Sequence, residues 1–440
     1  MTSDKRSTSE YLSRPDAPLV TPRGMGDLTP PFAAQRRALS RQLLSHFALR
    51  GYELVTPPLF EHASVIDRGR TNERGAREFV RFVEPETGEV VVLRPDITPQ
   101  VARIVATRLR ERPAPYRLSY EGRVLQRRLG RARKHRQTAQ VGVECIGVPS
   151  PAGDVETIAL ASSACQAVGL RDFRVELCSS ALVSPLLESL PLDVRERIAD
   201  QVASKDRAAL RATAQDEELP EATIAPLEAL LDHYGDLSVL TRAQSTFAWP
   251  AAQAALAELR AITERLVALG LGPHLRVDLS ETRGLSYYTG ASFQILAEGP
   301  GEPICSGGRY DNLLARFCAP QPATGFALYV DNLQWALERA GVTTGAQEAR
   351  YVVQVGEDDS GVALAASMHD AGVVAATLPG SPSVDAMLAF SRSWGYAAAL
   401  VPRKGGFQAY RTADGRSKDW PSLEPSVLAA LSAWATASED

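Results

Sequence analysis

Apolar residues recur every three or four positions along several stretches, and this spacing predicts amphipathic helices. The first stretch runs from Phe32 to Arg50, ends at Gly51 and leads into a short predicted strand, Tyr52–Thr56. The shared apolar face of this helix contains Leu39, Leu43, Leu44 and Phe47. That face packs either on the chain's own core or in a dimer interface, and the pattern leaves both open. A much longer Ala- and Leu-rich region, Ser179 to Leu271, is predicted to be helical.

Shorter apolar stretches predict strands at residues 89–93, 117–122, 140–147, 275–279 and 292–296. Thr98 is predicted to cap a helix that begins at Pro99, where a missing N–H costs nothing. The stretch Ile304–Leu333 contains the pair Gly307-Gly308, then a second buried strand that runs into a helix ending before Gly341. The glycine pair is either a simple turn or a place where the backbone approaches a ligand closely.

After Gln347 the pattern changes to strands that alternate with helices, which predicts a small α/β domain with a mostly parallel sheet. Its strands are expected at residues 351–355, 373–378 and 397–401. Residues 351–440 carry ten acidic and six basic side chains, a net charge of −4. This surface is therefore poorly suited to binding the RNA backbone.

Composition places the chain among ordinary globular proteins of two or three domains. Of its 440 residues, 45% are hydrophobic and 23% charged, and the net charge of −4 gives no basic field to attract nucleic acid. The five cysteines form no CxxC pair and the six histidines are scattered, so no metal site is expected. Residues 1–20 are expected to be a disordered lead-in, and the composition is typical of a cytoplasmic protein.

Three polar segments are candidates for chemistry. Asp96 and Thr98 either only cap a helix or form an anionic lip for an ammonium group. Arg283, Tyr287 and Tyr288 either pack across strands or clamp a carboxylate and a planar ring. A basic loop is either a solvated face, a polyphosphate or RNA site, or a surface that docks an acidic partner. Its basic residues are Arg127, Arg128, Arg131, Arg133, Lys134 and Arg136.

Taken in order, these segments resemble the histidyl-tRNA synthetase lineage of class II synthetases over about residues 21–341. The likeness rests on Thr21-Pro22-Arg23-Gly24, Leu93-Arg94-Pro95-Asp96, Arg117 to Glu144, Arg283 to Gly290, and Gly307 to Ala327. The resemblance implies an α+β fold with an antiparallel sheet flanked by helices and a helical insertion at about residues 180–271. Residues 348–440 look like a degenerate anticodon-binding domain.

The resemblance also implies a histidine pocket. Its residues would be Asp96, Thr98, Gln140, Glu144, Arg283, Tyr287 and Tyr288. Of these, Glu144 and Tyr288 would meet the imidazole and Arg283 the carboxylate. The positions that would hold ATP differ from the family's pattern, because Gln126, Arg128 and Asn332 replace an arginine, a glutamate and a second arginine, and Tyr329 replaces a glycine. Each hydrogen bond to a charged group contributes about 1.5–3 kcal/mol, so amino-acid activation is predicted to be lost.

A synthetase-like chain with the amino-acid pocket but without the ATP arginines resembles the regulatory subunits of ATP phosphoribosyltransferase, the first enzyme of histidine biosynthesis. Membership implies no cofactor, a short-form catalytic subunit as partner, a homodimer within a hetero-octamer, and L-histidine as feedback inhibitor. The basic loop, from Arg127 to Arg136, is a candidate interface. The alternatives are an active histidine–tRNA ligase and a stand-alone regulator that senses histidine or tRNA.

Overall fold

The computed structural model describes residues 20–69, 79–125, 136–188, 190–282, 287–342 and 349–437. Contacts group them into two units, a larger one of residues 20–27 and 36–342 and a smaller one of residues 28–35 and 349–437. Across these ranges, no helix is both long and apolar enough to cross a membrane.

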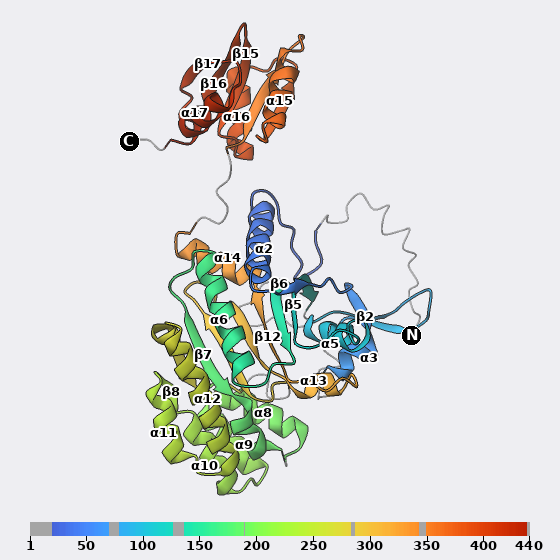
Figure 1. Ribbon diagram of the computed structural model, residues 1–440, viewed down its shortest axis with the longest axis vertical. Coiled ribbons are helices and arrows are strands. Elements are labelled where there is room, and N and C mark those ends of the chain that lie inside the picture. Colours follow the sequence, from blue (N-terminus) through green and yellow to red (C-terminus); the bar gives the residue numbers. More distant parts are fainter. Residues whose placement is uncertain are drawn as a thin grey trace, which may run out of the picture. The chain divides into compact units, whose positions relative to one another are not determined.

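A mixed sheet forms the centre of the larger unit (Figure 1). Within the described residues it has nine strands, in the order β1 (Glu53–Leu54), β5 (Tyr116–Leu125), β6 (Gln137–Ile146), β12 (Ala323–Tyr329), β11 (Cys305–Arg309), β10 (Ala291–Leu296), β7 (Arg174–Ser179), β9 (Leu275–Asp278) and β8 (Tyr234–Gly235). Neighbours are antiparallel except in the pairs β1–β5 and β7–β9. The expected α+β class, with a largely antiparallel sheet flanked by helices, is confirmed.

Helices pack against the sheet, and β6 in its middle is buried along almost its whole length. On one face lie α2 (Phe32–Ala48), α6 (Ala152–Ala167) and α14 (Val330–Arg339). The predicted apolar face of α2 packs on the chain's own core, where the Phe47 ring meets Phe326 edge-on at 5.7 Å. A second core cluster joins α5 (Thr98–Thr107) and α13 (Asn312–Ala315) to β5.

Two further parts complete the larger unit. A small antiparallel sheet consists of β2 (Phe60–His62), β4 (Val90–Leu93) and β3 (Arg81–Val83), next to α3 (Ala63–Arg68). The region predicted to be helical contains α7 (Ser180–Leu187), α8 (Leu192–Ala203), α9 (Arg207–Asp216), α10 (Glu221–Leu230), α11 (Ser238–Thr246) and α12 (Pro250–Ala268). Figure 1 shows α8 to α11 grouped beside β8, while α12 returns along the sheet and packs on β7.

Of the two readings of the Gly307-Gly308 pair, the structure excludes the turn, because both residues lie inside β11, between β10 and β12. Two other local predictions are wrong in detail, each because tertiary packing overrides a local signal. Thr98 is the first residue of α5 and not its cap, since the preceding Ile97 takes the capping position and no side chain caps the helix. The strand expected at Tyr52–Thr56 shrinks to the two residues of β1, which pair with β5.

The smaller unit contains β13 (Tyr351–Val355), α15 (Ser360–Asp370), β14 (Ala375–Pro379), α16 (Val384–Trp394), β15 (Ala398–Arg403), β16 (Gly406–Arg411), β17 (Ser417–Pro421) and α17 (Pro425–Thr436). The expected mostly parallel sheet is wrong. Two strand pairs, β13–β14 and β13–β15, are parallel, whereas β15–β16 and β16–β17 are antiparallel. The polar residues on β16 and β17 hid these two strands from the apolar pattern.

Candidate functional site

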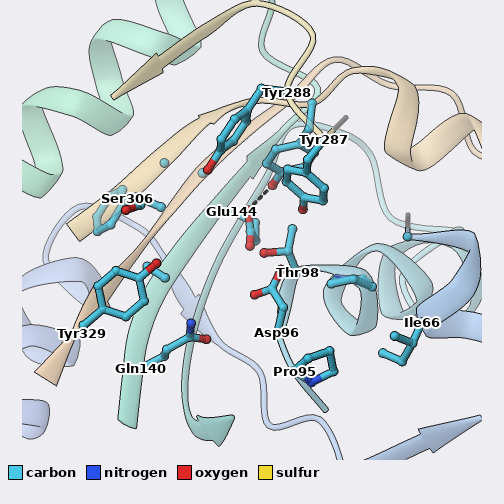
Figure 2. A pocket seen from close by; sticks show the side chains of 17 residues that line it. Ile66, Pro95, Asp96, Thr98, Gln140, Glu144, Tyr287, Tyr288, Ser306 and Tyr329 are labelled. Carbon is cyan, nitrogen blue, oxygen red and sulfur yellow. Dashed lines mark hydrogen bonds between the residues drawn. The ribbon is translucent and has the colours of Figure 1, made fainter. Parts of the chain in front are cut away.

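A cavity of about 320 Å³ lies where the sheet of the larger unit meets the start of α5 (Figure 2). Its lining comes from six segments that are far apart in the sequence. The lining residues are Ile66, Gly69, Pro95, Asp96, Thr98, Pro99, Gln140, Glu144, Tyr287, Tyr288, Ser306, Gly307, Tyr310, Gly325, Phe326, Ala327 and Tyr329. We call this cavity the central pocket.

Small residues of the neighbouring strands β11 and β12 form the floor of the central pocket, beside Gln140 and Glu144 of β6. Strand register places Glu144 beside Gly325, and Gly142 beside Ala327. A Cβ atom on Gly325 would lie only 1.9 Å from Glu144 Oε2, so glycine at this position makes room for the carboxyl group. Glycine in the strands therefore serves the pocket, and Gly307 of the Gly307-Gly308 pair also lines it.

Glu144 is the most deeply buried acid of the pocket, with 1% of its surface exposed. Burial raises the pKa of Glu144 to about 8, although a hydrogen bond donated by the Tyr310 hydroxyl to Oε2 opposes the rise. Its other oxygen, Oε1, is buried without a hydrogen-bond partner in the structure. A buried polar atom without a partner costs free energy, so Oε1 is suited to meet a donor on a ligand.

Aromatic hydroxyls surround this acid. The Tyr287 ring lies 5.4 Å from Tyr310 and 5.3 Å from Tyr288, measured between ring centroids. Burial raises the pKa of all three phenols well above 10, so they stay neutral hydrogen-bonding groups at physiological pH. Tyr287 Oη is buried without a partner, as is Oε1 of Gln140.

The loop before α5 brings a second acid to the pocket. Arg94 holds the loop in place, because its buried guanidinium donates to the carbonyl oxygens of Pro57, at 2.9 Å, and Arg123, at 2.8 Å. Asp96 Oδ1 accepts a hydrogen bond of 2.7 Å from the backbone N–H of Ile97. Figure 2 shows Asp96 and Thr98 directed into the same space as Glu144.

Two residues outside the cavity, Ser180 and Arg309, hold its walls. Ser180, at the start of α7, donates from its hydroxyl to the carbonyl oxygen of Tyr288 at 2.9 Å. Arg309, which is 3% exposed, forms an ion pair of 2.8 Å with the buried Asp154 and a second of 2.9 Å with Asp311. Arg309 thus anchors the strand end that carries Tyr310, and it does not line the cavity.

The structure brings six of the seven predicted histidine-binding residues together in the central pocket. The seventh, Arg283, lies outside the described residues, as do Gln126, Arg127, Arg128, Arg131, Arg133 and Lys134. Arg136 is described, and its backbone N–H donates to the carbonyl of Gly24 at 2.6 Å. Asn332 does not line the pocket, since its side-chain amide donates to the carbonyl of Pro303 at 2.8 Å.

Sequence reasoning missed Tyr310 and Ser306 as lining residues. Both flank the Gly307-Gly308 pair, and alternation along β11 was the signal that would have placed Ser306 on the pocket face.

The lining is acidic and otherwise neutral. Among the described residues, its charged or ionisable acids are Asp96 and Glu144, and no Lys, Arg or His side chain lines it. A pocket with these groups favours a ligand that carries a cationic group and ring or chain N–H donors. Across the described residues, no three His, Cys, Asp or Glu side chains come together as metal ligands would.

Comparisons with known proteins find relatives along most of the chain. The family model for histidyl-tRNA synthetase matches residues 24–333. The ATP phosphoribosyltransferase regulatory subunit of Moorella thermoacetica is 40% identical over 344 residues, which are 78% of this chain and 87% of that protein. The same subunit of Syntrophotalea carbinolica is 35% identical over 410 residues, 92% of this chain and 95% of that protein, so this likeness extends into the smaller unit.

Several solved structures are similar to most of the chain. One of them is the ATP phosphoribosyltransferase regulatory subunit/histidyl-tRNA synthetase from Bacillus halodurans, with a TM-score of 0.74 and 28% identity. The match covers 86% of this chain and 97% of that one.

Proposed function

Because the chain belongs to the family of ATP phosphoribosyltransferase regulatory subunits, which share the histidyl-tRNA synthetase fold, we propose that it regulates the first step of histidine biosynthesis. It binds a short-form catalytic subunit, as a homodimer within a hetero-octamer, and it senses L-histidine. It acts in the cytoplasm and has no aminoacylating activity of its own.

The central pocket carries this proposal, because its chemistry is complementary to L-histidine. Asp96 supplies a negative charge for the ammonium group, and Thr98 and Gln140 add neutral hydrogen-bonding groups. Glu144 and Tyr288 would bind the imidazole nitrogens, and Glu144 Oε1 is a buried polar atom without a hydrogen-bond partner in the structure. The Tyr287 hydroxyl beside them is also buried without a partner. Arg283 is the expected partner of the carboxylate.

Loss of the activation step is supported by the position of Asn332. A neutral amide replaces the guanidinium that the resemblance places on ATP, and that amide is engaged by the carbonyl of Pro303. It therefore adds no positive charge where a triphosphate would need one. Histidine regulates the partner by linkage, since a ligand that binds the inhibited assembly more tightly must shift the population toward inhibition.

Calorimetric titration with L-histidine, alongside ATP–pyrophosphate exchange, tests the proposal. We expect histidine binding without exchange. Asp96→Asn removes the ammonium's charged partner, an interaction of about 1.5–3 kcal/mol, and should weaken binding roughly 10–100-fold. The matched control is Asp232→Asn on the exposed end of the helical insertion, which should bind normally. Exchange in the wild type would restore the ligase alternative.

Assembly is tested separately by light scattering with a short-form catalytic subunit. A stable complex of larger mass than either component is expected, and histidine should inhibit its phosphoribosyl transfer. The basic loop from Arg127 to Arg136 is the proposed interface. Reversing several of its charges should weaken assembly, and an unchanged complex mass would contradict the interface while leaving the histidine pocket untouched.

A further inference from the structure

One residue of the pocket floor, Tyr329, is much larger than the floor residues before it on the same strand. Along β12 the residues that face the cavity are Gly325, Ala327 and Tyr329, because alternate side chains of a strand lie on one face. The first two are small and leave the floor open. Tyr329, the last residue of the strand, places a large ring there instead.

Strand register fixes where this ring stands. Gly325 pairs with Glu144, and Tyr329 pairs with Gln140, the residue four positions earlier on β6. Figure 2 shows the Tyr329 ring between Ser306 and Gln140, at the opposite end of the cavity from Tyr287. The Tyr329 ring therefore limits how far the cavity extends along the strand direction.

The spacing sets the length of the ligand. Four residues of strand span about 14 Å, and the Glu144 carboxyl group and the Tyr329 ring each occupy part of that length. An amino acid whose longest path has five or six bonds of about 1.5 Å each is at most about 9 Å long. The cavity of about 320 Å³ is at the small end of the usual range for ligand pockets, which suits a ligand of this size.

The two ends of the cavity also differ in chemistry. The carboxyl groups of Asp96 and Glu144 lie together with Tyr287. The Tyr329 end is lined by Ser306 and Gln140 and has no acidic side chain among the described lining residues. Neutral donors suit a carboxylate better than acids do, so a zwitterion is best bound with its carboxylate toward Tyr329.

We infer that Tyr329 determines specificity by closing the pocket behind the ligand's carboxylate, so that the site takes a free amino acid and excludes one conjugated to a nucleoside. This inference rests on the proposed histidine site, and it assigns the length limit to one side chain. A ring that only packed against its neighbours would not change which ligands bind.

The test is calorimetric titration of the full chain with L-histidine and with a non-hydrolysable conjugate, histidyl-sulfamoyl-adenosine. The wild type should bind the conjugate at least about 100-fold more weakly than histidine, a difference near 2.7 kcal/mol. Tyr329→Gly should raise the conjugate's affinity at least about tenfold. Tyr329→Phe keeps the ring and should keep the exclusion. Tyr329→Ala, a second opening variant, replaces Tyr329→Gly if that protein unfolds at a lower temperature.

Two results would overturn the inference: equal affinity of the wild type for both ligands, or a folded opening variant that gains no affinity for the conjugate. Failure of the wild type to bind histidine would instead contradict the proposed sensor function. In that case the affinity of the conjugate for the wild type and for the opening variant still shows whether Tyr329 excludes it. This measurement does not depend on histidine binding.

Discussion

Replacing Glu144 by glutamine should change how stability depends on pH. Glutamine keeps the shape of the side chain and an acceptor for the Tyr310 hydroxyl, but it removes the titration. The carboxyl group of Glu144 is buried, and its pKa is raised from 4.5 to about 8. Between these two values the folded protein holds a proton that the unfolded chain has released.

The sign and size of the effect follow by linkage. For an acid whose folded pKa is raised, the free energy of unfolding falls as pH rises, by about 1.4 kcal/mol per pH unit. The stability associated with Glu144 is fully present below pH 4.5 and is lost progressively up to about pH 8. Over the roughly 2.5 units between about pH 5 and 7.5 the loss is about 3 kcal/mol.

Urea unfolding of wild type and Glu144→Gln in matched, ligand-free buffers measures this difference. The variant should gain about 3 kcal/mol relative to wild type between about pH 5 and 7.5. Glu156→Gln is the control with the opposite sign, because the Arg117 guanidinium lowers the pKa of Glu156. That contribution is present above pH 4.5 and disappears in acid. A difference between Glu144→Gln and wild type that stays constant with pH would refute the reasoning.

Two further predictions concern the pocket's support. Gly325→Ala should displace the Glu144 carboxyl group, because the added Cβ would lie 1.9 Å from it, and calorimetry should show histidine binding weakened at least about tenfold. Gly272→Ala, whose Cβ would meet nothing closer than 3.6 Å, should bind normally; equal binding by both variants would contradict the account of the floor. Arg309→Met leaves Asp154 buried without its partner and should cost about 3–5 kcal/mol in thermal unfolding, and an unchanged midpoint would contradict this.

The sequence was most informative where several segments could be compared with one family. Asp96, Gln140 and Glu144 were proposed as pocket residues from motifs alone, and the structure places them around one cavity. Local signals were weaker. The residue type and position of Thr98 are typical of a helix cap. It is nevertheless the first residue of α5, and it lines the pocket. A hydroxyl near a helix start can serve either purpose, and only its surroundings decide which.

The pattern of apolar and polar residues by itself determined most of the helices and several central strands, because these depend on local periodicity. The candidate pocket residues came from the resemblance of ordered motifs to one family. Tertiary structure alone decided the strand order and register, which set Gly325 against Glu144 and Tyr329 against Gln140. It also decided the raised pKa of Glu144, which burial causes. Register and burial arise from contacts between residues far apart in the chain, and no local pattern encodes them.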